Sequence, residues 1–263
     1  MNGALKSRLA SRQAVMGSLA FLSSPDVVEV LAVSGFDYII VDLEHSPTTT
    51  ETAIHMIRAA QVHGMTPLVR VSENSEKLIL KALEMGAEGI VVPFVQSAED
   101  VARAARAVRY PPLGVRGTCT ASRSSRYGTL RPQFAAHTKK ANDSVLLVAL
   151  IEDMAGVRAI KDIVACEPGV DVVLVGRSDL SASIGQIGQA DHPEVMNATT
   201  TIIQAANQAS RPVAAGIVLG SLGETEKWMT AGCRFITYGT DSDLVLDAAT
   251  RARRAFDAAA GKG

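Results

Sequence analysis

The chain has 263 residues, of which 47% are hydrophobic, 20% charged and 4% aromatic, and its formal net charge is 26 − 27 = −1. Such a length is typical of one or two domains and allows a sizeable core without disulfides or a structural metal. The near-neutral charge and the few aromatic residues exclude nucleic acid as a partner. No apolar run approaches the roughly 20 residues that span a bilayer, so we expect no membrane insertion.

Cysteine usage and the first residues of the chain indicate where the protein works. Cys119, Cys166 and Cys233 are odd in number, far apart and without a CxxC motif, which is typical of a reducing compartment. The N-terminal stretch MNGALKSRLASRQ mixes charges with short apolar pieces and lacks the apolar core of a signal peptide. We therefore expect a cytoplasmic protein.

Short apolar runs alternate with longer helical stretches along the chain. The expected strands are Ala14–Phe21, Phe36–Asp42, Thr66–Val71, Ala87–Pro93, Ser144–Glu152, Asp171–Gly176, Pro212–Val218 and Arg234–Gly239. Several are almost continuously apolar, as strands buried on both faces of a parallel sheet are. The expected helices include Pro25–Ser34, Glu51–Val62, Ser75–Met85 and Ala98–Val108.

Eight βα units in about 250 residues predict an α/β fold, a single (β/α)8 TIM barrel over residues 1–263. A doubly wound sheet is the alternative, but no GxGxxG follows the first strand.

Two segments depart from the repeat. Residues Tyr110–Tyr127 form a long polar loop of the kind that often serves function. The Ala-rich helix Asp241–Ala260 is longer than barrel closure requires, and it either docks on a neighbouring subunit or is a plain outer helix.

Polar side chains follow several of the apolar runs, where barrel enzymes hold their sites. In chain order they are Asp42, Glu44, His45, Arg70, Glu152, Gly176, Arg177, Ser178 and Asp179. The runs themselves contain almost no other polar groups. In a barrel these residues converge on one mouth, which predicts an active site there.

The residue types in this set suit divalent-metal chemistry on a 2-oxo acid. Glu152 and Asp179, without a partnering cysteine or histidine cluster, are ligands for a hard ion such as Mg²⁺ or Mn²⁺. They leave about four octahedral positions for water and a chelating 2-oxo acid, whose enolate the ion would stabilise as a Lewis acid. Arg70 would add positive charge at the enolate oxygen. His45 is the natural general acid/base, directly or through a water.

Structural explanations compete with these roles. Glu44 can serve as a helix cap, His45 can be purely structural, and Arg70 can be a buried ion-pair partner. Asp153 is best explained as a helix-start carboxylate. The chain has no GxSxG motif and no lysine in an expected strand, which argues against a serine hydrolase and a Schiff-base aldolase.

Over nearly its whole length the chain resembles the HpcH/HpaI family, the class II, metal-dependent pyruvate aldolases. That family includes 4-hydroxy-2-oxoheptanedioate aldolase and 2-dehydro-3-deoxyglucarate aldolase. The matching motifs, in the correct order, are VDLEHSP (41–47), PLVRV (67–71), GAEGIVVPFVQSAEDV (86–101), RYPPLGVRG (109–117), SRSSRYG (122–128), LIED (150–153) and VGRSDLSASIG (175–185).

The resemblance implies a phosphoenolpyruvate/pyruvate-type barrel that cleaves a 4-hydroxy-2-oxo acid reversibly to pyruvate and an aldehyde, as a carbon–carbon lyase. It implies Glu152 and Asp179 as ligands of Mg²⁺, Mn²⁺ or Co²⁺, Arg70 at the enolate oxygen, and His45, supported by Asp42, as acid/base through water. The pyruvate carboxylate would be held around Gly176, Arg177, Ser178 and Asp179. The resemblance also implies a hexamer, a dimer of trimers, in which the C-terminal helix is exchanged between subunits.

Four positions depart from the family pattern. Leu150 stands where a glutamine is usual, Arg177 where a GPxD loop has proline, and Leu19 where a bulky aromatic residue is expected. Glu84 replaces the aspartate that pairs with the catalytic histidine. These changes leave the substrate open, and the alternatives are a siderophore-type citrate synthase, which joins acetyl-CoA to oxaloacetate, an oxaloacetate decarboxylase, or a barrel that only binds ligand.

Arginines near the predicted mouth are candidates for binding a distal carboxylate of the substrate. They are Arg177 and the arginines of the Tyr110–Tyr127 loop, namely Arg116, Arg123 and Arg126.

Overall fold

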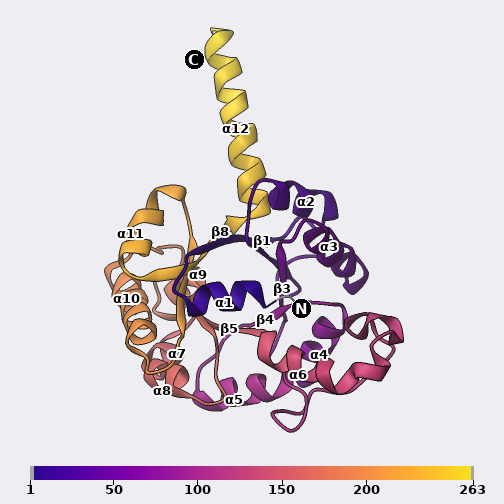
Figure 1. Cartoon of the computed structure of the whole chain (residues 1–263). Coiled ribbons are helices and arrows are strands. Elements are labelled where there is room, and N and C mark those ends of the chain that lie inside the picture. Colours follow the sequence, from indigo (N-terminus) through magenta and orange to yellow (C-terminus); the bar gives the residue numbers. More distant parts are fainter. Residues whose placement is uncertain (1–2, 262–263) are drawn as a thin grey trace.

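Eight parallel strands close into a barrel in chain order in the computed structural model, which describes residues 3–261 (Figure 1). Each strand pairs with the next, and β8 pairs with β1 to complete the ring. The strands are β1 Val15–Ala20, β2 Tyr38–Asp42, β3 Thr66–Arg70, β4 Gly89–Val92, β5 Leu146–Ile151, β6 Val172–Val175, β7 Ala214–Leu219 and β8 Cys233–Thr240. Each lies within about two residues of its expected range, and the closed ring confirms the predicted (β/α)8 barrel.

Helices surround the barrel on the outside (Figure 1). They are α1 Ala4–Ala10, α2 Pro25–Val33, α3 Thr50–Val62, α4 Glu76–Glu84, α5 Ala98–Ala107, α6 Phe134–Ser144, α7 Met154–Arg158, α8 Ile160–Ala165, α9 Arg177–Ser183, α10 Pro193–Gln208, α11 Thr225–Thr230 and α12 Asp241–Ala259, with the short 3₁₀ helices η1 Arg123–Gly128, η2 Arg131–Gln133 and η3 Leu222–Glu224. Side chains cap several of them, as where Ser24 accepts the amide N–H of Val27. Asp153 caps α7 by accepting the Gly156 amide at 2.8 Å, which confirms its structural role.

Two separate apolar cores follow from the alternation of side chains along each strand. On β2, Ile39 and Val41 face the helices and join the large core between barrel and helices. Ile40 faces the barrel interior, where a smaller core includes Tyr38 stacked on Phe235 with ring centroids 4.1 Å apart. This inner core fills the barrel below its mouth, so the polar strand ends rest on a rigid apolar floor.

The predicted 110–127 loop leaves the barrel after α5 and leads through η1 and η2 into α6. It is better packed than its polar sequence suggests, because Arg116 is only 2% exposed and its guanidinium lies 4.3 Å from the centre of the Tyr110 ring. Burial of this arginine anchors the loop against α4, where Glu84 is its ion-pair partner at 3.4 Å.

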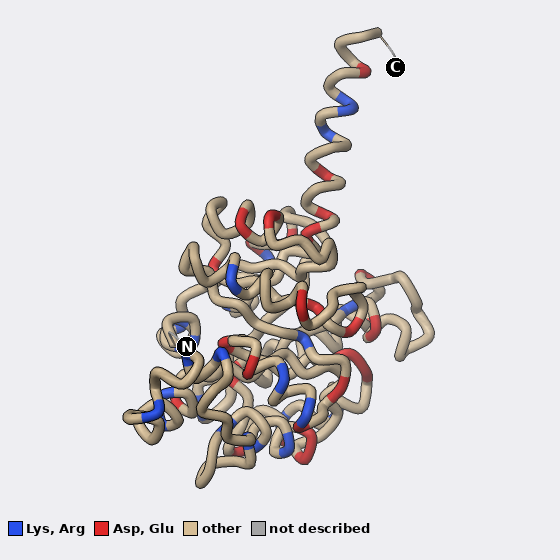
Figure 2. Tube along the Cα trace, turned by 90° about the vertical axis from the view of Figure 1, so that its right-hand side faces the viewer, with Lys and Arg blue, Asp and Glu red and all other residues tan. Residues whose placement is uncertain are grey.

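The C-terminal helix α12 extends away from the barrel (Figure 1). Its first turn is fixed by a capping box between Thr240 and Asp243. Beyond that turn most of its side chains are exposed, including Leu246 at 67% and Phe256 at 57%. Both signs of charge occur along it (Figure 2). Within residues 3–261, no helix is long and apolar enough to cross a membrane.

Candidate active site

A cavity of about 350 Å³ lies at the carboxyl ends of the barrel strands. Its floor is apolar and is built by inward-facing residues of five strands, namely Leu19, Ile40, Val91, Leu150 and Leu174, with Val218 of a sixth. Its polar lining comprises His45, Arg70, Glu152, Arg177, Ser178, Asp179, Thr240 and Asp243. The barrel therefore brings most of the predicted site residues to one mouth, with Gly176 also in the wall.

Asp42 and Arg70 form a buried, two-pronged ion pair between neighbouring strand ends. Arg70 Nε donates to Asp42 Oδ1 at 2.7 Å and Nη2 donates to Oδ2 at 2.9 Å. Asp42 is fully buried and also accepts the amide N–H groups of Glu44 and His45, both at 3.1 Å. Burial alone would lower the pKa of Arg70, but the hydrogen bond and charge of Asp42 raise it. Asp42 thus holds both the guanidinium and the turn that carries His45, and it does not line the cavity itself.

Glu44 and His45 occupy the turn after β2. Glu44 Oε2 lies 3.3 Å from Arg70 Nη1 and 3.9 Å from His45 Nε2, and it accepts no hydrogen bond from the described residues. Burial raises the pKa of Glu44, while the charges of Arg70 and His45 oppose that rise. The His45 side chain is 55% exposed. His45 therefore lies at the rim of the cavity, in contact with solvent.

Glu152 lies immediately after β5 and is 3% exposed. Burial raises the pKa of Glu152 to about 7; the neighbouring Asp179 carboxylate adds to the rise, and the Phe94 amide, which donates to Oε2 at 3.1 Å, opposes it. Gly176 packs directly against this side chain, since a Cβ on it would lie 2.8 Å from Glu152 Cγ. The absence of a side chain at Gly176 is what lets β6 approach the carboxylate.

Asp179 lies in the first turn of α9, which begins directly after β6 and Gly176. The first amide groups of a helix have no partner within the helix and favour a negative charge in front of them. Gly176, Ser178 and Asp179 all line the cavity beside Glu152. This corner combines two carboxylates with free N–H donors.

Arg177 lines the cavity, but its guanidinium is paired on the outer side. Its Nη2 donates to Glu224 Oε2 at 2.5 Å, and its Nη1 lies 3.4 Å from Asp191 Oδ1. The guanidinium also lies 5.6 Å from the centre of the Trp228 ring, and the residue is 5% exposed. Arg177 therefore ties the start of α9 to the segment that follows β7.

Glu84 and the loop arginines lie outside the cavity. Glu84, at the end of α4, accepts from Ser124 at 3.0 Å and pairs with Arg116, and no contact joins it to His45 within the described part of one chain. Arg123 donates to the Met85 carbonyl oxygen at 3.0 Å. The pairing of Glu84 with His45, and the binding of a distal carboxylate by these arginines, stay predictions.

The donor chemistry at Glu152 and Asp179 fits a hard divalent cation. A bound cation would compensate both the burial of Glu152 and the charge of the neighbouring Asp179 carboxylate, which together raise the pKa of Glu152. No group of three or more His, Cys, Asp or Glu side chains in residues 3–261 is arranged to hold a metal ion. The protein would thus supply these two ligands and leave the other positions to water and substrate.

The sequence left Glu44 open between a place in the site and a role as a helix cap, and the structure brings its carboxylate to both Arg70 and His45. One contact of the site was not predicted at all. The Phe94 amide reaches Glu152 because Phe94 adopts φ 48°, in the left-handed region. Nothing in the sequence around Phe94 indicates that contact.

Comparison with known proteins identifies the relatives of this chain. The profile of the family described as HpcH/HpaI aldolase/citrate lyase matches residues 18–248. A 5-keto-4-deoxy-D-glucarate aldolase of Klebsiella pneumoniae subsp. pneumoniae is 34% identical over 251 residues, which are 95% of each chain.

Solved structures give the same result. An HpcH/HpaI aldolase/citrate lyase family protein from Burkholderia cenocepacia J2315 superposes with a TM-score of 0.91 at 31% identity, covering 97% of this chain and 99% of that one. The citrate synthase SbnG superposes with a TM-score of 0.86 at 30% identity over 100% of both chains. These matches confirm the resemblance seen in the motifs, and the chain belongs to the HpcH/HpaI aldolase/citrate lyase family.

Proposed function

We propose that the protein is a divalent-metal-dependent aldolase that reversibly cleaves a 4-hydroxy-2-oxo acid to pyruvate and an aldehyde. The observation that carries the proposal is the convergence of Glu152, Asp179, Arg70 and His45 on one cavity above an apolar floor. The 5-keto-4-deoxy-D-glucarate aldolases among its relatives support the same reaction type.

The cation would be held by Glu152 and Asp179, as Mg²⁺, Mn²⁺ or Co²⁺. When bound, it supplies Lewis-acid polarisation of the 2-oxo group. The first amides of α9, at Arg177, Ser178 and Asp179, favour the substrate carboxylate at that corner. These contacts would orient the 2-oxo acid with its C4 end toward the rim.

Proton transfer would take place at the rim, where His45 lies. His45, directly or through a water, removes the proton of the C4 hydroxyl, the C4–O bond becomes a carbonyl, and the C3–C4 bond breaks. The electron pair of that bond passes into the enolate of pyruvate, whose oxygen Arg70 stabilises with a charge held in place by Asp42. The proton taken up by His45 is then returned to C3 of the enolate, directly or through a water, and this gives pyruvate.

The test is proton–deuterium exchange at the methyl group of pyruvate, followed by NMR in D₂O. Exchange is expected only with Mg²⁺ or Mn²⁺ present, and it should be lost in Glu152→Gln, which keeps the size of the side chain but removes its charge. A matched control is Glu194→Gln on the exposed start of α10. Absence of exchange in folded, metal-loaded protein would contradict the proposal.

A citrate synthase reaction on the same scaffold is the second candidate, favoured by the superposition on SbnG over the whole chain. It would use the same site to join an acetyl-CoA enolate to oxaloacetate. Formation of citrate from these two compounds, without exchange in pyruvate, would select this reaction. Release of pyruvate and CO₂ from oxaloacetate alone would instead identify a decarboxylase.

We further propose that the chain works in the cytoplasm as a homo-oligomer, a hexamer built as a dimer of trimers, in which α12 packs on a neighbouring subunit. Support comes from the exposed apolar residues Val245, Leu246 and Phe256 on a helix that leaves its own barrel (Figure 1). The three unpaired cysteines support a reducing location. Sedimentation of the whole chain and of Leu246→Asp measures the assembly, and a monomeric parent chain would refute it.

A further inference from the structure

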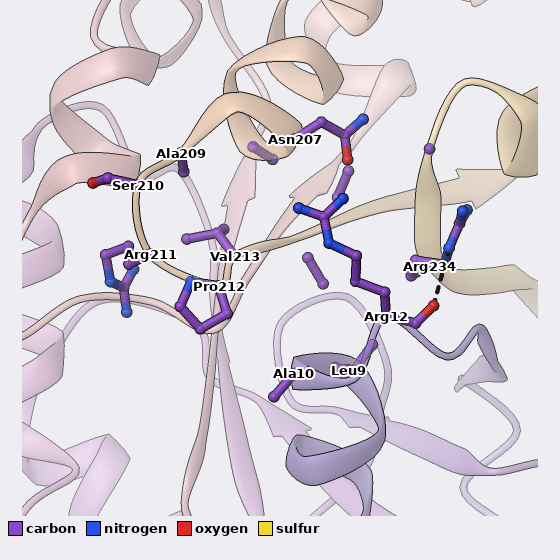
Figure 3. Close-up of a pocket in the computed structure, with 14 residues that line it drawn as sticks. Leu9, Ala10, Arg12, Asn207, Ala209, Ser210, Arg211, Pro212, Val213 and Arg234 are labelled. Carbon is purple, nitrogen blue, oxygen red and sulfur yellow. Dashed lines mark hydrogen bonds between the residues drawn. The ribbon is translucent and has the colours of Figure 1, made fainter.

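A second concave site lies at the opposite end of the barrel from the candidate active site. It is a pocket of about 410 Å³ at the amino ends of β7 and β8 and beside the turn that precedes β1 (Figure 3). We call it the basal pocket. It shares no lining residue with the cavity that contains Glu152.

Three arginines from three separate segments line the basal pocket. Arg12 comes from the turn after α1, Arg211 from the segment between α10 and β7, and Arg234 from the start of β8 (Figure 3). No aspartate or glutamate is among the described residues that line it. The pocket therefore concentrates positive charge that its own walls do not neutralise.

Two of the arginines are held by backbone carbonyl groups. Arg234 Nη1 donates to the Met229 and Cys233 carbonyl oxygens at 2.9 and 2.8 Å. Arg211 Nη1 donates to the Val170 carbonyl oxygen at 2.7 Å. Neutral acceptors fix these guanidinium groups in place but leave their charges intact, since a carbonyl cannot neutralise an arginine. Both side chains still have unused N–H donors.

The third arginine is positioned by its backbone and leaves its side chain free. Arg12 adopts φ 57°, in the left-handed region, and its carbonyl oxygen accepts from Arg234 Nε at 3.2 Å. Its guanidinium points into the open space of the pocket on the side of Asn207 (Figure 3). No hydrogen bond or ion pair engages that guanidinium within residues 3–261. Figure 3 shows this guanidinium between the side chains of Arg211 and Arg234, which lie to either side of it. An unengaged guanidinium in a pocket whose walls hold two further arginines and no carboxylate is suited to an anionic ligand.

From this geometry we infer that the basal pocket binds a small anion with two or more negative charges, a phosphate ester or a di- or tricarboxylate. Arginine donors match the oxygens of both groups in pairs, and charge-assisted bonds of this kind are the strong ones. A volume of about 410 Å³ accepts a molecule the size of a sugar phosphate. The inference is independent of the reaction at the other end of the barrel.

The experiment is calorimetric titration of metal-free protein at low ionic strength with inorganic phosphate, ribose 5-phosphate and citrate. Arg12→Gln removes the free guanidinium without breaking any contact inside the described chain. Arg158→Gln is the matched control, because Arg158 lies exposed at the end of α7, outside the pocket, and loses the same charge. We expect saturable binding of at least one anion, one per chain, with a Kd that rises about tenfold in Arg12→Gln and stays unchanged in Arg158→Gln.

The three probes distinguish the two ligand classes. Binding of the phosphate compounds alone identifies a phosphate ester as the ligand, and binding of citrate alone identifies a polycarboxylate. The inference is overturned if no probe gives saturable binding to the parent protein. It is equally overturned if Arg12→Gln binds as tightly as the parent, or if both variants lose affinity to the same extent.

Discussion

The close approach of Gly176 to Glu152 can be tested by adding one methyl group. In Gly176→Ala the new Cβ would lie 2.8 Å from Glu152 Cγ and 3.0 Å from Oε1. Ordinary contact begins at 3.4 Å, so the Glu152 side chain has to move by roughly 3.4 − 2.8 = 0.6 Å. The Gly176 backbone has φ −98°, which alanine adopts without strain, so the effect comes from this contact alone.

The expected magnitudes differ between stability and catalysis. Overpacking lowers the free energy of unfolding by about 1–3 kcal/mol. Replacing glycine by alanine raises it by about 0.4–1 kcal/mol, because alanine has less conformational freedom than glycine in the unfolded chain. We therefore expect a net loss of about 1 kcal/mol in the free energy of unfolding, measured by urea denaturation. On the proposed role of Glu152 as a metal ligand, its displacement by this distance should reduce the rate of pyruvate exchange by a factor on the order of 100.

Gly223→Ala is the control, because a Cβ there meets nothing closer than 3.8 Å and the residue lies outside the cavity. Glu152→Asp in the Gly176→Ala background shortens the clashing side chain and should recover stability without recovering activity. Parent-like exchange rates in Gly176→Ala would refute the reasoning, since they would mean that the position of Glu152 does not limit the reaction.

Three further changes test other parts of the structure. Asp42→Asn should lower the free energy of unfolding by about 3–5 kcal/mol, because it leaves buried Arg70 without its main counter-charge; an unchanged urea midpoint would contradict this. Exposed Cys119 should react with iodoacetamide in the native protein. Burial raises the pKa of Cys233 to about 12, so Cys233 should react only after the protein unfolds. Mass spectrometry locates the label, and labelling of Cys233 in the native protein would contradict its burial. Arg177→Met should leave the ratio of rates on aldehydes with and without a distal carboxylate unchanged, because the guanidinium is already paired; selective loss on the charged aldehyde would assign it to substrate binding.

The amino-acid sequence by itself determined the barrel and the identity of most polar groups at its mouth. Runs such as DYIIVD and VLLVALIE are apolar on both faces, and only a parallel sheet covered by helices buries them. Asp42 and Glu152 end those two runs and Arg70 ends the run TPLVR, so barrel closure alone brings them to one end. That argument needs only the chain direction of each strand.

The tertiary structure decided which partner each charged group finds. Arg177 and Glu224 are 47 positions apart, and Arg116 meets Glu84 across 32, so no local pattern predicts that these guanidinium groups are engaged outside the cavity. Arg12 and Arg234 of the basal pocket, 222 positions apart, are likewise brought together only by ring closure between β8 and β1. Hydrophobic periodicity encodes which face of an element is buried, whereas the pairing of charges depends on distances that exist only after the barrel has closed.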